Sequence, residues 1–226
     1  MRLIIISILA TVIGSCSEPQ TSLEQVIETG ELLVVTRNSP TSYILDSKGP
    51  SGPEYDLVKA FADSLEVNLV IHSVDNYSEI LPNLLSGKSH MVAAGSLLPE
   101  THQEYLNFGH PYESDDVHMI YKLGSGKPQS FDDVLERSIE VIADSNHSEL
   151  LANLKKSYPS LKWAEKNSVN VADLLAKVAS GDIDITISDA SDFHVQRHFY
   201  PELRIALDMR TGIPISWGFP KDSGDK

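Results

Sequence analysis

Short apolar runs alternate along this chain with stretches in which apolar residues recur at helical spacing. The runs "ELLVVTR" (31–37) and "DIDITIS" (182–188) are aliphatic and β-branched, which predicts buried strands. Between residues 55 and 65, apolar side chains instead recur every three or four positions, which predicts one buried face of a helix. Because strands and helices keep alternating, the sequence predicts an α/β fold with mainly parallel sheets.

The same pattern assigns the other elements. The predicted strands span 31–37, 67–74, 90–95, 115–123, 138–143, 161–165, 182–188, 203–209 and 213–219. The predicted helices span about 22–29, 55–65, 76–86, 131–135, 147–158, 171–179 and 190–199. The segment 38–53 is rich in Ser, Pro and Gly and is predicted to be a loop.

The alternation occurs twice, which predicts two lobes. The expected divisions are 1–15 signal peptide, 16–30 linker and short helix, 31–112 lobe 1, 113–202 lobe 2 with interlobe bridges, and 203–226 a truncated return to lobe 1. Ligands favour the carboxyl ends of parallel strands and the interfaces between lobes. The loops after Thr36, Gly95, Ala143 and Ser188 are therefore the candidate ligand-binding loops.

The N-terminus predicts export and anchoring. "MRLIIISILATVIGSC" has one basic residue, an apolar run too short to span a bilayer, and small residues before Cys16. "IGSC" resembles a bacterial lipobox, which implies acylation of Cys16 and a lipid anchor on the periplasmic face. Ser17 follows the cysteine, which resembles lipoproteins sorted to the outer membrane of Gram-negative bacteria. The alternative is an ordinary signal peptide with a chance cysteine.

Composition narrows the class of partner. The chain has 226 residues, 41% hydrophobic and 22% charged, with a net charge of −14. Such an acidic surface disfavours nucleic acid, and it disfavours anionic membranes as direct partners of the protein surface. Cys16 is the single cysteine, so no internal disulfide can form.

Several stretches, taken together and in order, resemble one family. They are "GELLVVTRNSP", "GPSGPEYDLVKAFADSLEVNL", "LLSGKSHMVAAG", "LNFGHPY" and "VASGDIDITISDASDF". Together they resemble the periplasmic solute-binding proteins of the polar-amino-acid type. That resemblance implies a two-lobed, periplasmic-binding-protein-like (type II) α/β fold, with the ligand cleft between the lobes. "VVTRNSPTSYI" and "DSNHSELLANLKKSYPSL" further resemble the sensor-like N-terminal module of the membrane-bound lytic murein transglycosylase F family.

The loop "LLPETHQEYLNFGHPY" (97–112) departs from the amino-acid binders. Their arginine for the ligand carboxylate stands six residues before the Phe of this segment, and here Phe108 places His102 there. The usual Thr three residues earlier is Pro99. The family resemblance also implies that Asp189 receives the ligand ammonium group; the alternative for Asp189 is a helix N-cap.

Other candidate ligand-binding residues surround these two. Ser145 and His147 lie at a strand-to-helix turn that can bind an anion, or Ser145 and Ser148 can simply cap the helix. Tyr43 is expected either to stack on a ligand or to cover its lobe. The remaining candidates, from the first and second ligand-binding loops, are Asn38, Ser39, Gly95 and Ser96.

The chain offers little catalytic chemistry. The pair His194 and His198 lacks the Glu of the H-E-x-x-H pattern, so no metal site and no cofactor are predicted. The transglycosylase family acts through a Glu-Ser pair at a helix end, and Glu113–Ser114 lies instead at the interlobe bridge. The sequence ends where that family continues into its catalytic module, so we expect a fragment or a split gene.

Three hypotheses follow for function. The first is the ligand-sensing module of a lytic transglycosylase F-like lipoprotein, which binds a muropeptide or amino acid and regulates a missing C-terminal catalytic module. The second is a solute-binding lipoprotein of an ABC transporter for an amino-acid-like ligand. The third is a degenerate remnant that binds no ligand.

Overall fold

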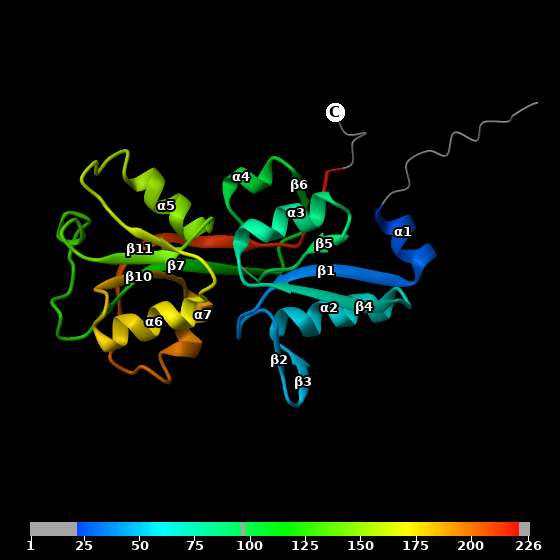
Figure 1. Cartoon of the computed structure of the whole chain (residues 1–226), viewed down its shortest axis with the longest axis horizontal. Helices are drawn as coiled ribbons and strands as arrows, with labels where there is room; N and C mark the ends of the chain where they lie inside the picture. The colour runs from blue at the N-terminus through cyan, green and yellow to red at the C-terminus, as the bar shows by residue number, and fades with distance from the viewer. Residues whose placement is uncertain (1–21, 96–97, 222–226) are drawn as a thin grey trace, which may run out of the picture.

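The computed structural model describes residues 22–95 and 98–221, which form two α/β lobes lying side by side (Figure 1). Each lobe has a five-stranded sheet with helices on both faces. We call the lobe that contains the first strand lobe 1 and the other lobe 2. The predicted lipidation site, Cys16, and the candidate residue Ser96 lie outside the described residues.

Lobe 1 is built around the parallel strands that the apolar runs predict. Its strand order is β4-β1-β5-β12-β6, and β1 pairs in parallel with both β4 and β5. Helices α2 and α3 cover opposite faces of the sheet (Figure 1). The strands are β1 (Glu31–Arg37), β4 (Asn68–Val74), β5 (Met91–Val92), β6 (Leu106–Phe108) and β12 (Gly218–Pro220). The helices are α1 (Ser22–Thr29), α2 (Pro53–Ser64), η1 (Tyr77–Glu79), α3 (Ile80–Leu85) and α4 (Glu100–Gln103).

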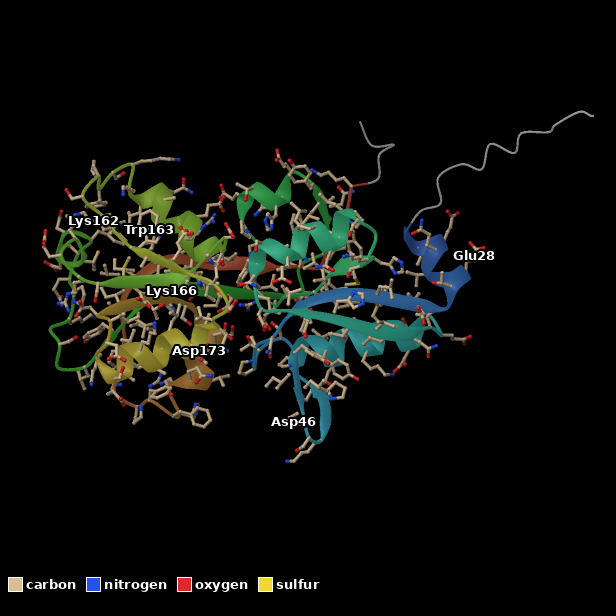
Figure 2. The ribbon with its side chains drawn as sticks, in the orientation of Figure 1. Glu28, Asp46, Lys162, Trp163, Lys166 and Asp173 are labelled. Atoms are coloured by element: carbon tan, nitrogen blue, oxygen red, sulfur yellow. The ribbon has the colours of Figure 1, made fainter. Side chains whose placement is uncertain are left out.

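Lobe 2 mixes parallel and antiparallel pairs. Its strand order is β11-β7-β10-β8-β9, with α5 on one face and α6 and α7 on the other (Figure 1). The strands are β7 (Glu113–Lys122), β8 (Ile139–Ile142), β9 (Ala164–Lys166), β10 (Ile185–Asp189) and β11 (Leu203–Ile215). The helices are η2 (Asp132–Val134), α5 (Asn146–Leu154), α6 (Val171–Ser180) and α7 (Ala190–Gln196). Asn170 and Asp173 form a reciprocal capping box at the start of α6, with both bonds at 3.0 Å; Asp173 is labelled in Figure 2.

Apolar packing extends across the lobe boundary. Lobe 1 buries one cluster around β1 and α2, and lobe 2 buries another around β7, β8 and β10. A third cluster contains side chains of both lobes, including Tyr77 and Leu98 from lobe 1 and Ile142 and Val171 from lobe 2. Where its members from the two lobes contact each other, this packing favours the closed arrangement by the hydrophobic effect.

Two neighbouring chain segments connect the lobes. β7 and β11 pair antiparallel along their length, with register shifts between Ile205 and Ile213. Backbone hydrogen bonds continue from this ribbon toward lobe 1: the Tyr112 amide donates to the Ile215 carbonyl at 3.1 Å, and the Gly109 amide donates to the Trp217 carbonyl at 2.9 Å. β11 belongs to the sheet of lobe 2, so the chain returns to lobe 1 only at β12, later than the expected boundary at residue 203.

The segment predicted as a loop contains a small hairpin, β2 (Ile44–Asp46) with β3 (Gly49–Ser51). Figure 2 shows Asp46 at its tip, away from both sheets. The hairpin joins α2 at Gly52, where φ is +135° and an added Cβ would lie 2.3 Å from the Ser42 carbonyl oxygen. Glycine is therefore required where this loop meets the helix.

Candidate functional site

A cavity of about 450 Å³ lies between the lobes, and we call it the outer cavity. Lobe 1 contributes the η1–α3 segment and the region of α4, and lobe 2 contributes the start of α5 and β9. The lining residues are Ser78, Leu81, Pro82, Pro99, Thr101, His102, Asp144, Ser145, Ser148, Glu149 and Glu165. Two predicted ligand-binding residues, His102 of lobe 1 and Ser145 of lobe 2, therefore line the same cavity.

The outer cavity is acidic. Asp144, Glu149 and Glu165 line it, and its lining contains no Arg or Lys among the described residues. Burial lowers the pKa of His102, although Glu149 and Asp144 act in the opposite direction. The imidazole is therefore neutral at pH 7, and its buried Nδ1 has no hydrogen-bond partner in the described part of the chain. Such a lining suits a cationic or neutral polar group better than a carboxylate.

The loop predicted to hold the ligand is itself held by lobe 2. The Glu149 carboxylate accepts hydrogen bonds from the backbone amides of Glu100 at 2.6 Å and Thr101 at 3.3 Å. These amides open α4, where a carboxylate satisfies free N–H groups. The contact joins α5 to α4 and therefore links the lobes beside His102.

The start of α5 is satisfied within the protein. Ser145 is the N-cap: its Oγ accepts from the Ser148 amide at 3.3 Å and donates to the Ile142 carbonyl at 2.6 Å. The Ser148 hydroxyl in turn donates to the Glu165 carboxylate, which also accepts from Trp163 Nε1 at 3.2 Å. A carboxylate already lies at this turn, so the capping alternative describes Ser145 better than the predicted anion site.

Beside the outer cavity, four ionisable side chains from both lobes are buried together, and we call them the central polar cluster: Arg37, His147, Asp189 and Asp192. His147 Nε2 and Asp189 Oδ1 are 3.0 Å apart, with both side chains at most 3% exposed. Arg37 Nη2 lies 3.7 Å from Asp192 Oδ2, and Arg37 Nε donates to the Ala94 carbonyl at 3.2 Å. Arg37 ends β1, and Asp192 lies in the first turn of α7, so this pair also crosses the lobe boundary.

His147 and Asp189 face each other in the buried interior. His147 was expected beside an anion-binding helix end and is instead fully buried against Asp189. Asp189 occupies the N-cap position of α7, yet its side chain makes no capping hydrogen bond. Its carboxylate faces His147 and leaves Oδ2 without a hydrogen-bond partner among the described residues.

Burial opposes the ionisation of both carboxylates, with different outcomes. For Asp189, His147 and Arg37 outweigh burial and hold its pKa below the usual range. For Asp192, burial and the neighbouring Asp189 outweigh Arg37 and raise its pKa. Burial lowers the pKa of Arg37, but Tyr77, Asp192 and Asp189 together raise it by more. Asp189 is thus the well-stabilised anion of the cluster, and Asp192 the poorly stabilised one.

Several polar atoms in and beside the cluster lack hydrogen-bond partners within the described residues. They are Arg37 Nη2, Asn146 Nδ2 and Oδ1, His147 Nδ1, Asp189 Oδ2 and Asp192 Oδ2. Buried polar groups are nearly always paired, because an unpaired one costs about 1–3 kcal/mol. This concentration of unmade hydrogen bonds at the meeting of two lobes marks a place where polar groups can bind a ligand.

The remaining predicted residues are spread around these two regions. Asn38 and Ser39 line a cavity of about 20 Å³ together with Arg37. Tyr43 packs its ring 5.9 Å from that of Tyr55, which places it over lobe 1 rather than in the outer cavity.

Gly95 lines a separate cavity of about 570 Å³, next to the strands β7 and β11 that connect the lobes. Its φ is +59°, and an added Cβ would lie 3.0 Å from Ser42 Oγ, so a side chain there would be strained and crowded. Glu54 lines the same cavity and accepts from Tyr112 Oη at 2.6 Å and Trp217 Nε1 at 2.5 Å. Burial and the hydrogen bond to Glu54 raise the pKa of Tyr112 above its usual range.

Sequence reasoning missed Arg37, Thr41, Glu149 and Asp192. Arg37 had a usable signal, because a cation directly after a buried aliphatic strand needs a partner. Asp192 follows Asp189 by three residues and so lies on the same side of the first turn of α7. The pairing between them could not be seen, since nothing local connects β1 to α7.

Two further observations concern metals and membranes. Across residues 22–95 and 98–221, no group of three or more His, Cys, Asp or Glu side chains is placed to hold a metal ion. Within the same residues, the structure contains no helix with the length and apolar character needed to cross a bilayer.

Comparison with known proteins adds to this geometry. The model of the bacterial extracellular solute-binding proteins, family 3, matches residues 32–168. The chain is 37% identical over 215 residues to membrane-bound lytic murein transglycosylase F of Pseudomonas fluorescens, covering 95% of the chain and 44% of that relative. It is 34% identical over 201 residues to the protein of the same name from Saccharophagus degradans, covering 89% and 40%. The chain thus spans less than half the length of these relatives.

Solved structures share the fold. An ancestral arginine-binding protein bound to arginine has a TM-score of 0.75 at 24% identity, covering 87% of each chain. Holo ArgBP from T. maritima has a TM-score of 0.75 at 20% identity, covering 89% of this chain and 87% of that one. The expected two-lobed type II α/β fold is confirmed.

Proposed function

Because the chain belongs to the bacterial extracellular solute-binding proteins of family 3, we propose that it is a ligand-sensing module that binds a small molecule between its lobes. The proposed ligand is a cell-wall fragment or an amino acid, sensed in peptidoglycan turnover by a lytic murein transglycosylase F-like lipoprotein. The observation that carries this proposal is the concentration of unpaired buried polar groups where the two lobes meet, next to the outer cavity.

The proposal of a sensing rather than a catalytic role is supported by local structure. The Glu113–Ser114 pair begins strand β7, whereas the transglycosylase resemblance calls for a Glu-Ser pair at the end of a helix. Moreover, the aligned part of the Pseudomonas fluorescens relative is 44% of its length, which leaves room there for a separate catalytic module.

The outer cavity suits one end of such a ligand. Its volume of about 450 Å³ is within the range of small-molecule sites. Its carboxylates can receive an ammonium group, and its serine and threonine hydroxyls can bond to sugar or peptide groups. Amino acids and muropeptides both carry such groups, which is why these two ligand classes are proposed together.

Regulation would follow from lobe closure. A ligand that contacts both lobes stabilises the closed arrangement, in which Glu149 of lobe 2 holds α4 of lobe 1. If an attached catalytic module has different contacts with the open and closed forms, ligand binding shifts the balance between these forms and so changes how the module is held.

The proposed location is the periplasmic face of the outer membrane, anchored through lipid on Cys16. This rests on the lipobox-like "IGSC" and on the word membrane-bound in the names of the relatives. Labelling cells with radioactive palmitate tests it: the protein should become labelled, and Cys16→Ser should abolish the label. Equal labelling of both would contradict lipidation at this residue.

An alternative function is a solute-binding lipoprotein of an ABC transporter, with an amino-acid-like ligand. The observation in its favour is the likeness of the whole fold to arginine-binding proteins. A permease gene beside the gene for this chain, with no in-frame lysozyme-like module downstream, would favour transport over sensing.

Titration calorimetry tests the main proposal. The full chain would be titrated with the twenty L-amino acids and with muramyl dipeptide. At least one should bind. We propose that Asp189 receives the ligand ammonium group, as the family resemblance implies, so Asp189→Asn should lower the affinity at least tenfold because the carboxylate charge is lost. Asp63→Asn, at an exposed pair with Lys59, is the matched control and should leave binding unchanged. No binding by any probe would contradict the proposal and favour a remnant without a ligand.

A further inference from the structure

One carboxylate of lobe 2 is bound almost entirely by lobe 1. Asp192 Oδ1 accepts from Thr41 Oγ1 at 2.5 Å and from Ser39 Oγ at 3.4 Å, and Arg37 Nη2 lies 3.7 Å from Oδ2. All three partners belong to β1 or to the loop that follows it. Asp192 itself stands on α7 of lobe 2 and is 4% exposed.

We propose that Arg37, Ser39 and Thr41 form a carboxylate-binding half-site on lobe 1, and that Asp192 occupies this half-site in place of a ligand carboxylate. As an assignment of a ligand group, this rests on the proposed function. It names the ligand chemistry: a free carboxylate, as in an amino acid or a peptide end. In this proposal, Arg37 replaces the ligand-binding arginine of the amino-acid binders, whose position in the loop is occupied here by His102.

The half-site is pre-formed. The Ser39 and Thr41 hydroxyls lie 2.8 Å apart, and the Thr41 amide donates to Ser39 Oγ at 3.2 Å, which fixes the short loop. Arg37 is oriented by its Nε bond to the Ala94 carbonyl and by the Tyr77 ring, 5.2 Å from its Cζ. A guanidinium held in this way, with two hydroxyls beside it, is a typical receptor for a carboxylate.

Asp192 does not fill this receptor well. Arg37 Nη2 and Asp192 Oδ2 are both buried, and neither has a hydrogen-bond partner among the described residues. At 3.7 Å the pair is an ion contact without a hydrogen bond. Asp192 is fixed to α7, whereas a free carboxylate can approach the guanidinium in the bidentate geometry.

The surroundings also favour displacement of Asp192. Burial and the charge of Asp189 raise the pKa of Asp192, so its ionised form is poorly stabilised where it lies. A ligand that brings its own carboxylate to Arg37 and its ammonium group toward Asp189 would replace this repulsion with two attractive pairs. Three cavities have been described: the outer cavity, the small cavity lined by Asn38 and the cavity lined by Gly95. Among the described residues that line them, Arg37 is the one basic side chain of the Arg or Lys type.

Chemical rescue by acetate tests the half-site without a known ligand. The full chain carrying Asp192→Ala should have an empty receptor, and sodium acetate should bind to it. We expect 50 mM acetate, at constant sodium concentration against chloride, to raise the thermal unfolding midpoint of this variant by about 2–4 °C. The unsubstituted chain, whose receptor holds Asp192, should not respond.

Two further variants locate the effect. Arg37→Lys combined with Asp192→Ala should lose the acetate response, because lysine cannot form the bidentate contact. Asp63→Ala, which removes an exposed carboxylate of lobe 1, should respond to acetate no more than the unsubstituted chain. An equal response in all proteins, or no response in Asp192→Ala, would overturn the half-site. If Asp192→Ala does not fold, Asp192→Asn with the ¹⁵Nε signal of Arg37 as readout serves the same purpose: acetate should shift that signal, and an unchanged signal would overturn the inference.

Comparing an amino acid with its amide tests this inference separately from the proposed function. For whichever L-amino acid binds in calorimetry, its amide should bind at least tenfold more weakly, because the amide has no carboxylate for Arg37. Equal binding of acid and amide would leave the proposed function standing and overturn the assignment of the half-site to a ligand carboxylate. Acetate rescue without binding of any amino acid or muramyl dipeptide would support the half-site and contradict the proposed function.

Discussion

The outer cavity and the central polar cluster lie side by side between the same two lobes, yet they are opposites. The outer cavity has about 450 Å³ of space and, among the described residues, a lining without Arg or Lys, while the cluster has a buried guanidinium and two buried carboxylates. Space and charge complementarity are therefore separated in this closed structure. A zwitterionic ligand needs both, so the comparison teaches that recognition requires the lobes to open and the cluster to rearrange.

The largest expected effect comes from removing the cation of the cluster. Arg37→Ala leaves Asp192 and Asp189 buried without their guanidinium, and should lower the free energy of unfolding by about 3–5 kcal/mol. Urea denaturation measures this. Lys59→Ala, at an exposed ion pair, is the control and should change the free energy by less than about 0.5 kcal/mol. A similarly small change for Arg37→Ala would mean that the cluster is not a dry, coupled unit.

The two histidines compare the regions directly. His147→Ala removes the partner of buried Asp189 and should lower the free energy of unfolding by about 2–3 kcal/mol. His102→Ala removes an imidazole from an open cavity and should cost less than about 1 kcal/mol. Urea denaturation of both variants under the same conditions measures the two losses of unfolding free energy. Equal losses would contradict the view that the cluster is buried and the outer cavity open.

Adding a cation to the outer cavity should give this cavity the charge that it lacks relative to the central polar cluster. His102→Arg places a guanidinium where the amino-acid binders have theirs, beside the space that a ligand can enter. Affinity for free L-amino acids should then rise about tenfold, equivalent to about 1.4 kcal/mol. Calorimetry with the panel above measures the gain. His102→Gln, which adds no charge, is the matched control; an equal gain in both variants, or no gain in His102→Arg, would contradict this interpretation of the position.

The smallest effect is a difference in pH dependence within the cluster. The pKa of Asp192 is raised above 3.8, so its favourable contribution is full below pH 3.8 and is lost as pH rises through its folded pKa. The pKa of Asp189 is lowered below 3.8, so its contribution is present above pH 3.8 and is lost as pH falls through its folded pKa.

Two isosteric variants separate these carboxylates. Relative to the unsubstituted chain, Asp192→Asn should become more stable as pH rises from 4 to 7, whereas Asp189→Asn should become relatively less stable as pH rises from 2 to 4. Urea denaturation across these ranges measures both trends. Parallel curves for the two variants would show that the carboxylates share one environment.

Much of the fold could be predicted from the sequence, for a physical reason. Segments such as β1, α6 and β10 match their predicted positions within a few residues, because a continuous apolar run indicates a buried strand and apolar residues at helical spacing indicate a helix. The hairpin β2–β3 and strand β6 were missed because each strand is three residues long and carries no periodicity. The predicted strand 90–95 is only Met91–Val92, since β12 pairs beside it at one residue, Gly218 with Val92.

The candidate site could be predicted only in part. His102 and Ser145 were both placed in ligand-binding loops, and both line the outer cavity, because strand ends in an α/β fold gather at one edge. Arg37 and Asp192 were missed because their pairing depends on how the two lobes meet. His147 was identified from its turn, but the turn does not reveal that the ring points into the buried interior against Asp189.

The paired strands β7 and β11 have a mechanical consequence. The two strands that connect the lobes are hydrogen-bonded to each other along their length. They therefore resist bending apart and deform most easily by twisting about their common axis. The register of this strand pair is irregular between Ile205 and Ile213. Opening is therefore expected to be a rotation with essentially one degree of freedom, which the angle between the two sheets would report.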